Sequence, residues 1–214
     1  MAERALIEGR PVLVVIDIQG GEGAVGAEGP AIPLMPGYDA ALARAPELVA
    51  AARTHGIPVV FFQEAHRRDL VDFGRELDGV EGVHLLEGDP GTELDPRLGV
   101  GPEDYVIRKR RYSCFFGTDF EILLRGLGAE TLFLIGGHTD VCVHYTFVDA
   151  HQRDYHCRVV EDCVAGSSVR AHEAALEAMA YLQSRARCTV DEVLAAFAAH
   201  AARGAPSQGV ESGA

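Results

Sequence analysis

Short apolar runs alternate along this chain with longer segments whose apolar residues recur at helical spacing. The runs are rich in Val, Ile, Leu and Phe, which is typical of strands buried on both faces of a parallel sheet; they are Pro11–Ile18, Val59–Gln63, Tyr105–Lys109, Thr131–Ile135 and Arg158–Glu161. The segments with helical spacing are Tyr38–His55, Asp119–Gly126, Val143–Arg153, Val169–Gln183 and the end of Thr189–His200. This alternation predicts an α/β fold, a three-layer α/β/α sandwich with a mostly parallel central sheet.

The predicted elements fit one domain over residues 1–200, followed by a disordered tail over residues 201–214. A chain of 214 residues is long enough to bury one good core. The tail is small and polar in composition, as chain ends without ordered contacts commonly are. Residues 64–101 contain many Gly, Asp and Pro residues and predict a loop. A loop of this length in a compact domain is usually functional.

The formal charge of −13 argues against nucleic acid and anionic membranes as partners. Nucleic acid and anionic membranes attract clustered Lys and Arg. The one dense basic run is Arg108–Arg111, which we interpret as a solvated strand end. We therefore expect a small-molecule substrate and neither nucleic acid nor membrane as a partner. Residues 1–10 lack the apolar segment of a secretory signal, and no apolar run is long enough to span a membrane. We expect a cytoplasmic protein whose five cysteines are free thiols.

The sequence GGHTDVCVHYT, residues 136–146, is the strongest candidate for chemistry. It joins the predicted strand Thr131–Ile135 to the predicted helix Val143–Arg153, so Cys142 lies on a glycine-flanked bend before a helix. Backbone N–H groups and the positive end of the helix dipole stabilise a thiolate at such a position. The same amides stabilise the oxyanion that forms once the thiolate has attacked a carbonyl. Cys142 is therefore a candidate nucleophile.

Two further reactive side chains lie at the ends of predicted strands, Asp17 in Pro11–Ile18 and Lys109 in Tyr105–Lys109. Ligands of a parallel sheet bind outside the carboxyl ends of its strands, so we expect Asp17, Lys109 and Cys142 to converge. Asp17 would accept the thiol proton and later protonate a leaving amine. Lys109 would keep Asp17 ionised at rest and favour the thiolate. Each residue alone also has a structural explanation, as a loop cap, a member of a basic run or a small core residue.

Three segments of the chain resemble the isochorismatase-like cysteine hydrolase superfamily, which includes nicotinamidases, N-carbamoylsarcosine amidohydrolases, ureidoacrylate amidohydrolases and biuret hydrolases. The segments are VVIDIQ, RKRRYSCFFGTDF and GGHTDVCVHYT. The aspartate after an apolar strand, the K-x-x-Y-S-x-F-x-x-T pattern and the G-x-x-T-x-x-C-V-x-x-T pattern occur in the order of the superfamily. The resemblance extends from about Pro11 to Gly166 and assigns the Asp–Lys–Cys triad of the superfamily to Asp17, Lys109 and Cys142.

The resemblance has further implications for the site and for assembly. It implies a cis peptide bond between Gly137 and His138, and an oxyanion hole formed by the backbone amides of His138 and Cys142. His138 occupies a position that is often small in the superfamily, so its side chain is expected to reach toward the pocket. The superfamily commonly forms dimers or tetramers, and we expect a homo-oligomer on this basis alone.

Nicotinamidases of this superfamily hold a metal near the second strand, with an Asp-x-His element and further histidines downstream. Glu64 and His66 stand where the Asp-x-His element is expected, and His84 aligns with the last metal histidine. These ligand types suit zinc or another divalent cation. However, Glu64 replaces the aspartate and no intermediate histidine is evident, so His66 and His84 are also readable as polar loop residues. We expect no cofactor, with a zinc-containing, nicotinamidase-like enzyme as the alternative.

Candidate substrate-binding residues follow from side-chain chemistry. An arginine binds a carboxylate or ureido oxygen bidentately, and Arg67 and Arg75 lie in the predicted loop. Tyr112, Phe115 and Tyr145 offer an apolar or stacking wall. Solvated arginines and core aromatic residues are the alternative explanations. The other cysteines lack an acid–base partner in this interpretation and are taken as structural: Cys114, Cys157, Cys163 and Cys188.

The presence of Cys142 favours acyl transfer, because vinyl-ether cleavage of the isochorismatase type needs only acid catalysis by the aspartate. We expect a hydrolase that cleaves a C–N bond of a small carboxamide or N-carbamoyl compound through a covalent acyl-enzyme and releases ammonia or an amine. Isochorismatase activity is one alternative. A non-catalytic binding protein is another, against which the intact residues Asp17, Lys109 and Cys142 argue.

Overall fold

A six-stranded parallel sheet, ordered β3-β2-β1-β4-β5-β6, forms the centre of the molecule. The computed structural model describes residues 5–20 and 32–204. The strands are β1 Pro11–Ile16, β2 Val59–Glu64, β3 Tyr105–Lys109, β4 Thr131–Gly137, β5 His156–Ala165 and β6 Arg187–Cys188. β1, β2 and β4 are buried along their whole length, as their continuous apolar runs predict.

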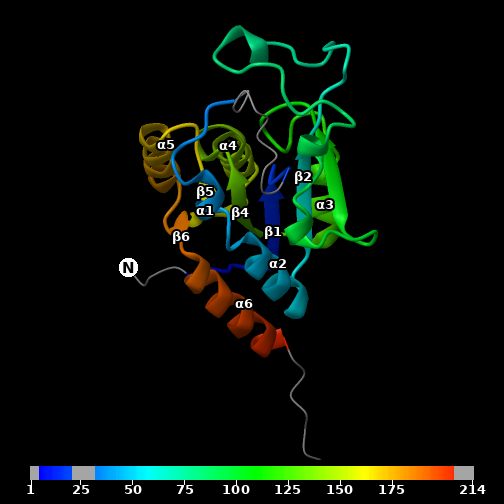
Figure 1. The fold of residues 1–214 in the computed structure, drawn as a ribbon. Helices are drawn as coiled ribbons and strands as arrows, with labels where there is room; N and C mark the ends of the chain where they lie inside the picture. Colours follow the sequence, from blue (N-terminus) through cyan, green and yellow to red (C-terminus); the bar gives the residue numbers. More distant parts are fainter. Residues whose placement is uncertain (1–4, 21–31, 205–214) are drawn as a thin grey trace, which may run out of the picture.

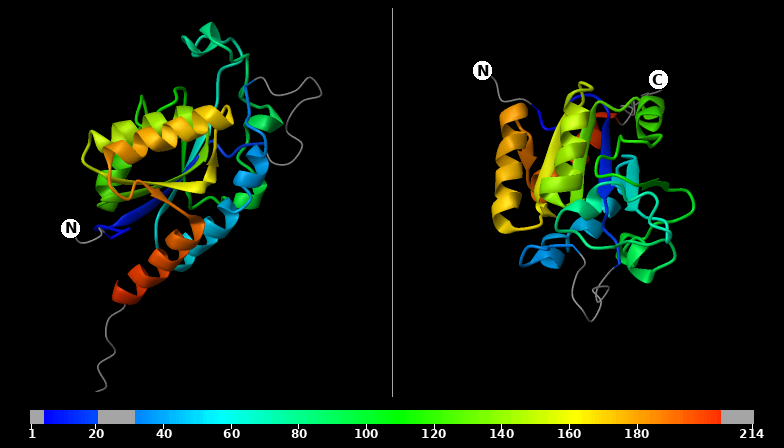
Figure 2. Two further views of the ribbon diagram at one scale, coloured as in Figure 1. Left: turned by 90° about the vertical axis from the view of Figure 1, so that its left-hand side faces the viewer. Right: turned by 90° about the horizontal axis from the view of Figure 1, so that it is seen from above.

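Helices cover both faces of the sheet. On one face lie α1 Tyr38–Ala41, α2 Ala45–Thr54 and α6 Val190–Gly204; on the other lie α3 Phe120–Leu127, α4 His144–His151 and α5 Val169–Leu182. Figures 1 and 2 show α5 on one side of the sheet and α2 with α6 on the other. Alternate side chains of β1 enter the two apolar clusters, Leu13 on one face and Val14 on the other. The predicted three-layer sandwich is confirmed.

The register of the strands decides which residues share the carboxyl edge of the sheet. Ile16 of β1 pairs with Phe62 of β2 and with Gly136 of β4. Glu64, the last residue of β2, pairs with Lys109, the last residue of β3. Parallel pairing therefore places the ends of β1, β2, β3 and β4 side by side, below the long loop at the top of Figure 1.

The prediction of one helix over Tyr38–His55 is wrong, because α1 ends at Ala41 and α2 begins at Ala45. Pro46 explains the break. In a continuous helix its ring would clash with the carbonyl of Leu42, and it has no N–H to donate to that carbonyl. In the first turn of α2 the missing N–H costs nothing, since that donor has no partner within the helix.

The C-terminal half of the sheet is more extensive than predicted. β5 has 10 residues, and β6 was not predicted. Charged residues such as Arg158 and Asp162 interrupt the apolar pattern of β5 and conceal its length. α6 continues to Gly204, past the predicted end of the domain at residue 200. Residues 205–214 of the predicted tail lie outside the described residues.

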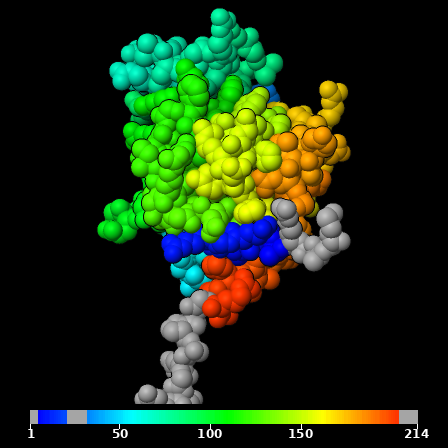
Figure 3. Space-filling view, turned by 180° about the vertical axis from the view of Figure 1, so that it is seen from behind, coloured from blue at the N-terminus to red at the C-terminus, as the bar shows by residue number. Residues whose placement is uncertain are grey.

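Residues 65–104 connect β2 to β3 without a strand or an α-helix, which agrees with the predicted loop. Three short 3-10 helices lie within them: Glu76–Asp78, Pro90–Thr92 and Pro96–Leu98. Part of the loop projects above the sheet in Figure 1, and in the view from behind it forms the top of the molecule (Figure 3).

The basic run Arg108–Arg111 holds this loop, so its interpretation as a solvated strand end is wrong. Arg110 donates to the carbonyl oxygen of Ala65, and its guanidinium lies 2.5 Å from the carboxylate of Glu87. A second ion pair joins Arg110 to Asp72 at 3.4 Å. Arg110 therefore fastens the first half of the loop, from Ala65 to Glu87, to the end of β3.

The five cysteines are all free and buried, which confirms the expectation of free thiols. Those other than Cys142 lie within the two apolar clusters: Cys114, Cys157, Cys163 and Cys188. Within the described ranges, no helix combines the length and the apolar character needed to cross a membrane.

Candidate active site

Asp17, Lys109 and Cys142 meet at the carboxyl edge of the sheet. Lys109 Nζ lies 2.8 Å from Asp17 Oδ2 and 3.4 Å from Cys142 Sγ. Lys109 and Cys142 are buried, with 1% and 5% of their surface exposed. The predicted convergence of these side chains is present in the structure, and the catalytic roles of the three residues remain a prediction.

Asp17 is directed into the site by the backbone just after β1. Its φ of 52° lies in the left-handed region, where the chain turns sharply out of the strand. Asp17 Oδ1 accepts a hydrogen bond of 3.1 Å from the backbone N–H of Glu64, which leaves Oδ2 for Lys109. The carboxylate is thus fixed between the end of β2 and the ammonium group.

Burial and the buried cation set the protonation states of the site. Burial raises the pKa of the Asp17 carboxyl to about 6, against the lowering effect of Lys109. Burial also raises the pKa of the Cys142 thiol, again opposed by Lys109. Burial lowers the pKa of Lys109, but Asp17, Cys142 and Glu64 together raise it well above its ordinary value. At neutral pH the site therefore holds an ammonium, a carboxylate and a protonated thiol.

A tight backbone turn carries Cys142. β4 ends at Gly137, a five-residue π-helical turn spans Thr139–Val143, and α4 follows. The Gly137–His138 peptide bond is cis, as the resemblance implies. A Cβ at Gly137 would overlap the hydroxyl group of Tyr38, so a side chain at this position would displace Tyr38.

The His138 side chain is held by the segment before α1. Its Nε2 lies 2.7 Å from the carbonyl oxygen of Pro33, and its ring lies 5.4 Å from the ring of Tyr38. The carbonyl oxygen of His138 accepts from the N–H groups of Val141 and Val143, each at 3.1 Å. These contacts fix the residue whose backbone N–H was predicted, with that of Cys142, to form the oxyanion hole.

Glu64 places a second carboxylate on Lys109, a contact that the sequence did not indicate. Glu64 Oε2 lies 2.6 Å from Lys109 Nζ and 3.6 Å from Cys142 Sγ. Oxygens of Asp17 and Glu64 and the sulfur of Cys142 all lie within 4.8 Å of one another. Although burial raises the pKa of Glu64, Lys109 and hydrogen bonds from His66 and other donors hold it well below its ordinary value. Lys109 is therefore surrounded by two carboxylates and the thiol.

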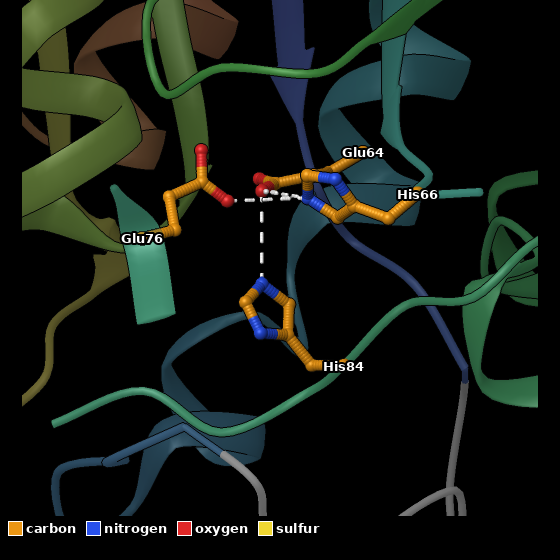
Figure 4. A group of neighbouring side chains, drawn as sticks. All are labelled: Glu64, His66, Glu76 and His84. Atoms are coloured by element: carbon orange, nitrogen blue, oxygen red, sulfur yellow. Dashed lines mark hydrogen bonds and ion pairs between the residues drawn. The ribbon is translucent and has the colours of Figure 1, made fainter. Parts of the chain in front are cut away.

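The other oxygen of Glu64 belongs to a cluster of four possible metal ligands (Figure 4). Glu64 Oε1 lies 3.2 Å from Nε2 of His66 and 3.7 Å from Nε2 of His84. Glu76 Oε2 lies 3.2 Å from the same nitrogen of His66. One ligand atom of each residue lies within 4.8 Å of those of the others. The structure thus unites the three predicted metal residues with a fourth, Glu76.

The chemistry of this cluster fits a divalent cation. Glu76 is buried, and neither of its carboxylate oxygens makes a hydrogen bond among the described residues. Such a group is costly unless a cation compensates it. Two imidazole nitrogens and two carboxylates are a donor set that suits zinc. Without a cation, burial lowers the pKa of His66, but Glu64 and Glu76 outweigh it and raise that pKa to about 9.

Glu76 is the site residue that the sequence did not reveal. It lies in the first 3-10 helix of the loop, between the exposed Arg75 and Leu77. No spacing relates it to Glu64 or His66, because irregular backbone separates them. The one available signal was an acidic residue beside Leu77 in a loop that already contained candidate ligands.

Of the predicted substrate-binding residues, two lie on the surface and one lies in the core. The side chain of Arg75 is 94% exposed and pairs with Asp78 at 2.7 Å. Arg67 is also on the surface, with its guanidinium 3.4 Å from Asp69. In the single chain both side chains lie at the surface beside an aspartate, and their role in substrate binding stays a prediction. Phe115, five residues before the start of α3, is buried in the core, and its ring centroid lies 4.8 Å from that of Phe120.

Tyr112 and Tyr145 form a stacked pair, with ring centroids 5.9 Å apart and an interplanar angle of 25°. The hydroxyl group of Tyr112 donates to the carboxylate of Glu81 at 3.0 Å, and Tyr145 stacks in turn on His144. Contact of these rings with a substrate stays a prediction.

Comparison with known proteins agrees with the fold. Residues 11–191 match the isochorismatase domain model. The chain belongs to the isochorismatase family. A ureidoacrylate amidohydrolase of Azorhizobium caulinodans is 32% identical over 142 residues, which cover 59% of this chain and 63% of that relative's length.

The chain is also similar to solved structures of two amidases. The N-carbamoylsarcosine amidase of Thermoplasma acidophilum has 34% sequence identity and a TM-score of 0.62, covering 73% of this chain and 84% of its own. The pyrazinamidase of Pyrococcus horikoshii, solved in complex with zinc, has 27% identity and a TM-score of 0.69, covering 85% and 98%.

Proposed function

We propose that this isochorismatase-family hydrolase is a cysteine-dependent amidohydrolase that cleaves a C–N bond of a small carboxamide or N-carbamoyl compound. The observation that carries the proposal is the position of Lys109 Nζ, in contact with both the Asp17 carboxylate and the Cys142 sulfur. A buried nucleophile, an acid–base group and a fixed cation are the components of acyl transfer. The ureidoacrylate amidohydrolase and the N-carbamoylsarcosine amidase among its relatives support this class of substrate.

In the proposed reaction, Asp17 accepts the thiol proton as the sulfur of Cys142 attacks the substrate carbonyl carbon. The backbone N–H groups of His138 and Cys142 stabilise the resulting oxyanion. When the C–N bond breaks, Asp17 returns the proton to the leaving nitrogen, which departs as ammonia or an amine. Water then attacks the thioester, Asp17 takes one of its protons, and the sulfur leaves with that proton as the acid product dissociates.

Lys109 and Glu64 have opposite effects on this reaction. Lys109 favours the thiolate, since a cation within contact distance stabilises negative charge on sulfur. Glu64 opposes it, because its carboxylate lies 3.6 Å from the same sulfur. A partner that neutralises Glu64 from its other side would favour the thiolate.

We further propose that Glu64, His66, Glu76 and His84 hold a divalent cation, for which zinc is the first choice. The buried carboxylate of Glu76, which makes no hydrogen bond among the described residues and has an ion-pair contact with His66, supports this proposal, as does the zinc of the pyrazinamidase relative. It favours the metal-containing, nicotinamidase-like alternative over an enzyme without a cofactor. When bound, such a cation supplies a Lewis acid beside the nucleophile.

The test is an ammonia-release assay with wild-type protein and Cys142→Ala on nicotinamide, N-carbamoyl amino acids, biuret, maleamate and ureidoacrylate. We expect the wild type to hydrolyse at least one compound and Cys142→Ala to lose that activity while keeping its thermal midpoint. Cys157→Ala is the matched control, since it removes a buried thiol at the start of β5, where the sulfur lies 4.0 Å from the carbonyl oxygen of Phe147 in α4, and it should retain activity.

Two outcomes would redirect the proposal. Wild-type rates in Cys142→Ala would exclude the cysteine nucleophile. Cleavage of an isochorismate-like vinyl ether that survives Cys142→Ala but not Asp17→Asn would identify an isochorismatase instead. Repeating the assay after dialysis against a chelator reports on the cation separately.

A further inference from the structure

Gln19 follows the triad aspartate by two residues, and both the oxygen and the nitrogen of its side-chain amide form hydrogen bonds with the backbone of Glu64. Gln19 Oε1 accepts from the N–H of Glu64 at 3.0 Å, and Gln19 Nε2 donates to the carbonyl oxygen of Glu64 at 2.8 Å. This pair of bonds imitates the pairing of a strand. It continues the contact between β1 and β2 beyond the last residue of β1.

The same N–H of Glu64 also donates to Asp17 Oδ1 at 3.1 Å. Gln19 and Asp17 therefore share one donor, and any shift of the Glu64 backbone changes the orientation of the Asp17 carboxylate. The Glu64 side chain leaves this backbone position toward Lys109 Nζ, 2.6 Å away. The distances between Asp17, Glu64 and Lys109 thus depend on one peptide segment that Gln19 holds.

Gln19 reaches the metal-ligand loop as well. Its Nε2 lies 2.5 Å from the carbonyl oxygen of Thr92, and the hydroxyl group of Thr92 donates to the carbonyl oxygen of Leu86 at 2.6 Å. Backbone bonds of 2.8 Å on either side of His66 join it to Leu85 and Glu87. The segment that follows His84 is therefore tied to His66 by pairing and to Gln19 through Thr92.

We propose that Gln19 is a positioning residue that holds the acid–base half of the site, Asp17 and Lys109, in register with Glu64 and the cation cluster. The inference rests on the proposed function for its catalytic consequence. Its structural content is independent of the substrate: one side-chain amide connects β1, the end of β2 and the loop that carries His84. Gln19 itself contacts neither Cys142 nor the ligand atoms of the cluster, so it acts through the residues that it holds.

The alternative is that Gln19 only stabilises the fold. Gln63 provides a matched control, because it is buried, adjacent to Glu64 and donates from its Nε2 to the same carbonyl oxygen of Thr92, at 2.9 Å. Gln63 differs in having no side-chain bond to the backbone of Glu64. If Gln19 has a purely structural role, Gln19→Leu and Gln63→Leu should change kcat and stability to a similar extent. If it is a positioning residue, only Gln19→Leu should lower kcat strongly.

The experiment compares wild type, Gln19→Leu, Gln19→Glu and Gln63→Leu. For Gln19→Leu we expect kcat to fall by about tenfold to a hundredfold, as small misplacements of reacting groups do, with KM within about threefold of wild type. Zinc affinity, measured by titration in the absence of substrate, should fall by about tenfold or more. Gln19→Glu keeps the side-chain size and one acceptor, so its kcat and zinc affinity should lie between those of wild type and Gln19→Leu. Gln63→Leu should lower the thermal midpoint without these changes.

Crystal structures of the two leucine variants complete the test. In Gln19→Leu the Lys109 Nζ–Asp17 Oδ2 contact should lengthen beyond hydrogen-bonding distance, and in Gln63→Leu it should not. Wild-type kcat in Gln19→Leu, or equal losses of kcat in Gln19→Leu and Gln63→Leu, would overturn the inference. A wild type without Cys142-dependent activity would instead refute the proposed function, and an unchanged Lys109–Asp17 contact in Gln19→Leu would then refute the positioning role by itself.

Discussion

Asp17 and Lys109 are placed by strands, whereas Glu76 and His84 are placed by a loop, although all four side chains gather at one edge of the sheet. The strand pair β2–β3 ends with Glu64 opposite Lys109, so backbone hydrogen bonds alone set their separation. Glu76 instead depends on irregular backbone and on attraction to His66. The strands of the sheet therefore position the triad residues Asp17 and Lys109. The loop residues of the cation cluster are held in place by the charges of the cluster itself.

Lys109→Met should have the largest effect, because it leaves the buried carboxylates of Asp17 and Glu64 without their cation. Removing one partner of a buried ion pair costs about 3–5 kcal/mol, and the thiolate loses its stabilising charge. We expect kcat to fall by about a thousandfold and urea denaturation to show the lost stability. Arg108→Met, one residue earlier on β3, is the control and should cost less than about 1 kcal/mol. Equal stability losses in the two variants would contradict the buried-cation account.

Asp17→Asn should remove the acid–base group while preserving the fold. General acid–base catalysis contributes roughly 10²–10⁴-fold, so kcat should fall within that range. In the wild type, Asp17 must be ionised to accept the thiol proton, and its pKa is raised to about 6. The kcat/KM profile should therefore fall as the pH is lowered through about 6. An acid limb near the value of an exposed aspartate, about 4, would show that the carboxyl is not buried as described.

Glu76→Gln should weaken the cation cluster without touching the triad. Loss of an outer-shell partner typically costs roughly 10–100-fold in metal affinity, so loss of a ligand carboxylate should cost at least as much. Zinc titration by calorimetry measures this directly, with Glu103→Gln, an exposed residue of the same loop, as control. Unchanged zinc affinity in Glu76→Gln would separate Glu76 from the site.

His66 should give the smallest effect, a pH dependence of stability in the chelated protein. Its pKa is raised from 6.5 to about 9 in the folded state. The protonated imidazole therefore adds stability that is fully present below pH 6.5 and is lost as the pH rises through about 9. Zinc requires the neutral imidazole, so zinc affinity should rise across the same interval. Urea midpoints of chelated wild type and His66→Gln at pH 6.5 and 9 test this; a wild type that is no less stable at pH 9 would contradict it.

The sequence predicted the strand-borne part of the site because strand ends are visible in the hydrophobic pattern. Buried apolar runs end at Asp17 and Lys109, and a glycine-flanked bend carries Cys142. Parallel pairing then brings these residues together, since it places the carboxyl ends of strands that are distant in the sequence at one edge of the sheet. The resemblance to the superfamily added the cis bond before His138, which no pattern of apolar and polar residues indicates.

The metal-ligand residues could be predicted only where the resemblance to nicotinamidases covers them. That resemblance pointed to Glu64 and His66 after the second apolar run and to His84 downstream. Glu76 was missed because its burial results from tertiary contacts with His66, and an isolated acid in a loop is ordinarily solvated. The chemistry of Arg75 suits a substrate, but its backbone position leaves the side chain in water in the single chain, so its role stays a prediction.

Mass spectrometry of a quenched reaction tests whether Cys142 forms a covalent acyl-enzyme. Wild-type protein is mixed with the best substrate of the panel, quenched with acid within the first turnovers, digested and analysed for acyl adducts. We expect an adduct with the mass of the substrate's acyl group on the peptide that contains Cys142, and ammonia or amine released in step with it. Turnover with no adduct at Cys142, together with full activity of Cys142→Ala, would contradict this expectation.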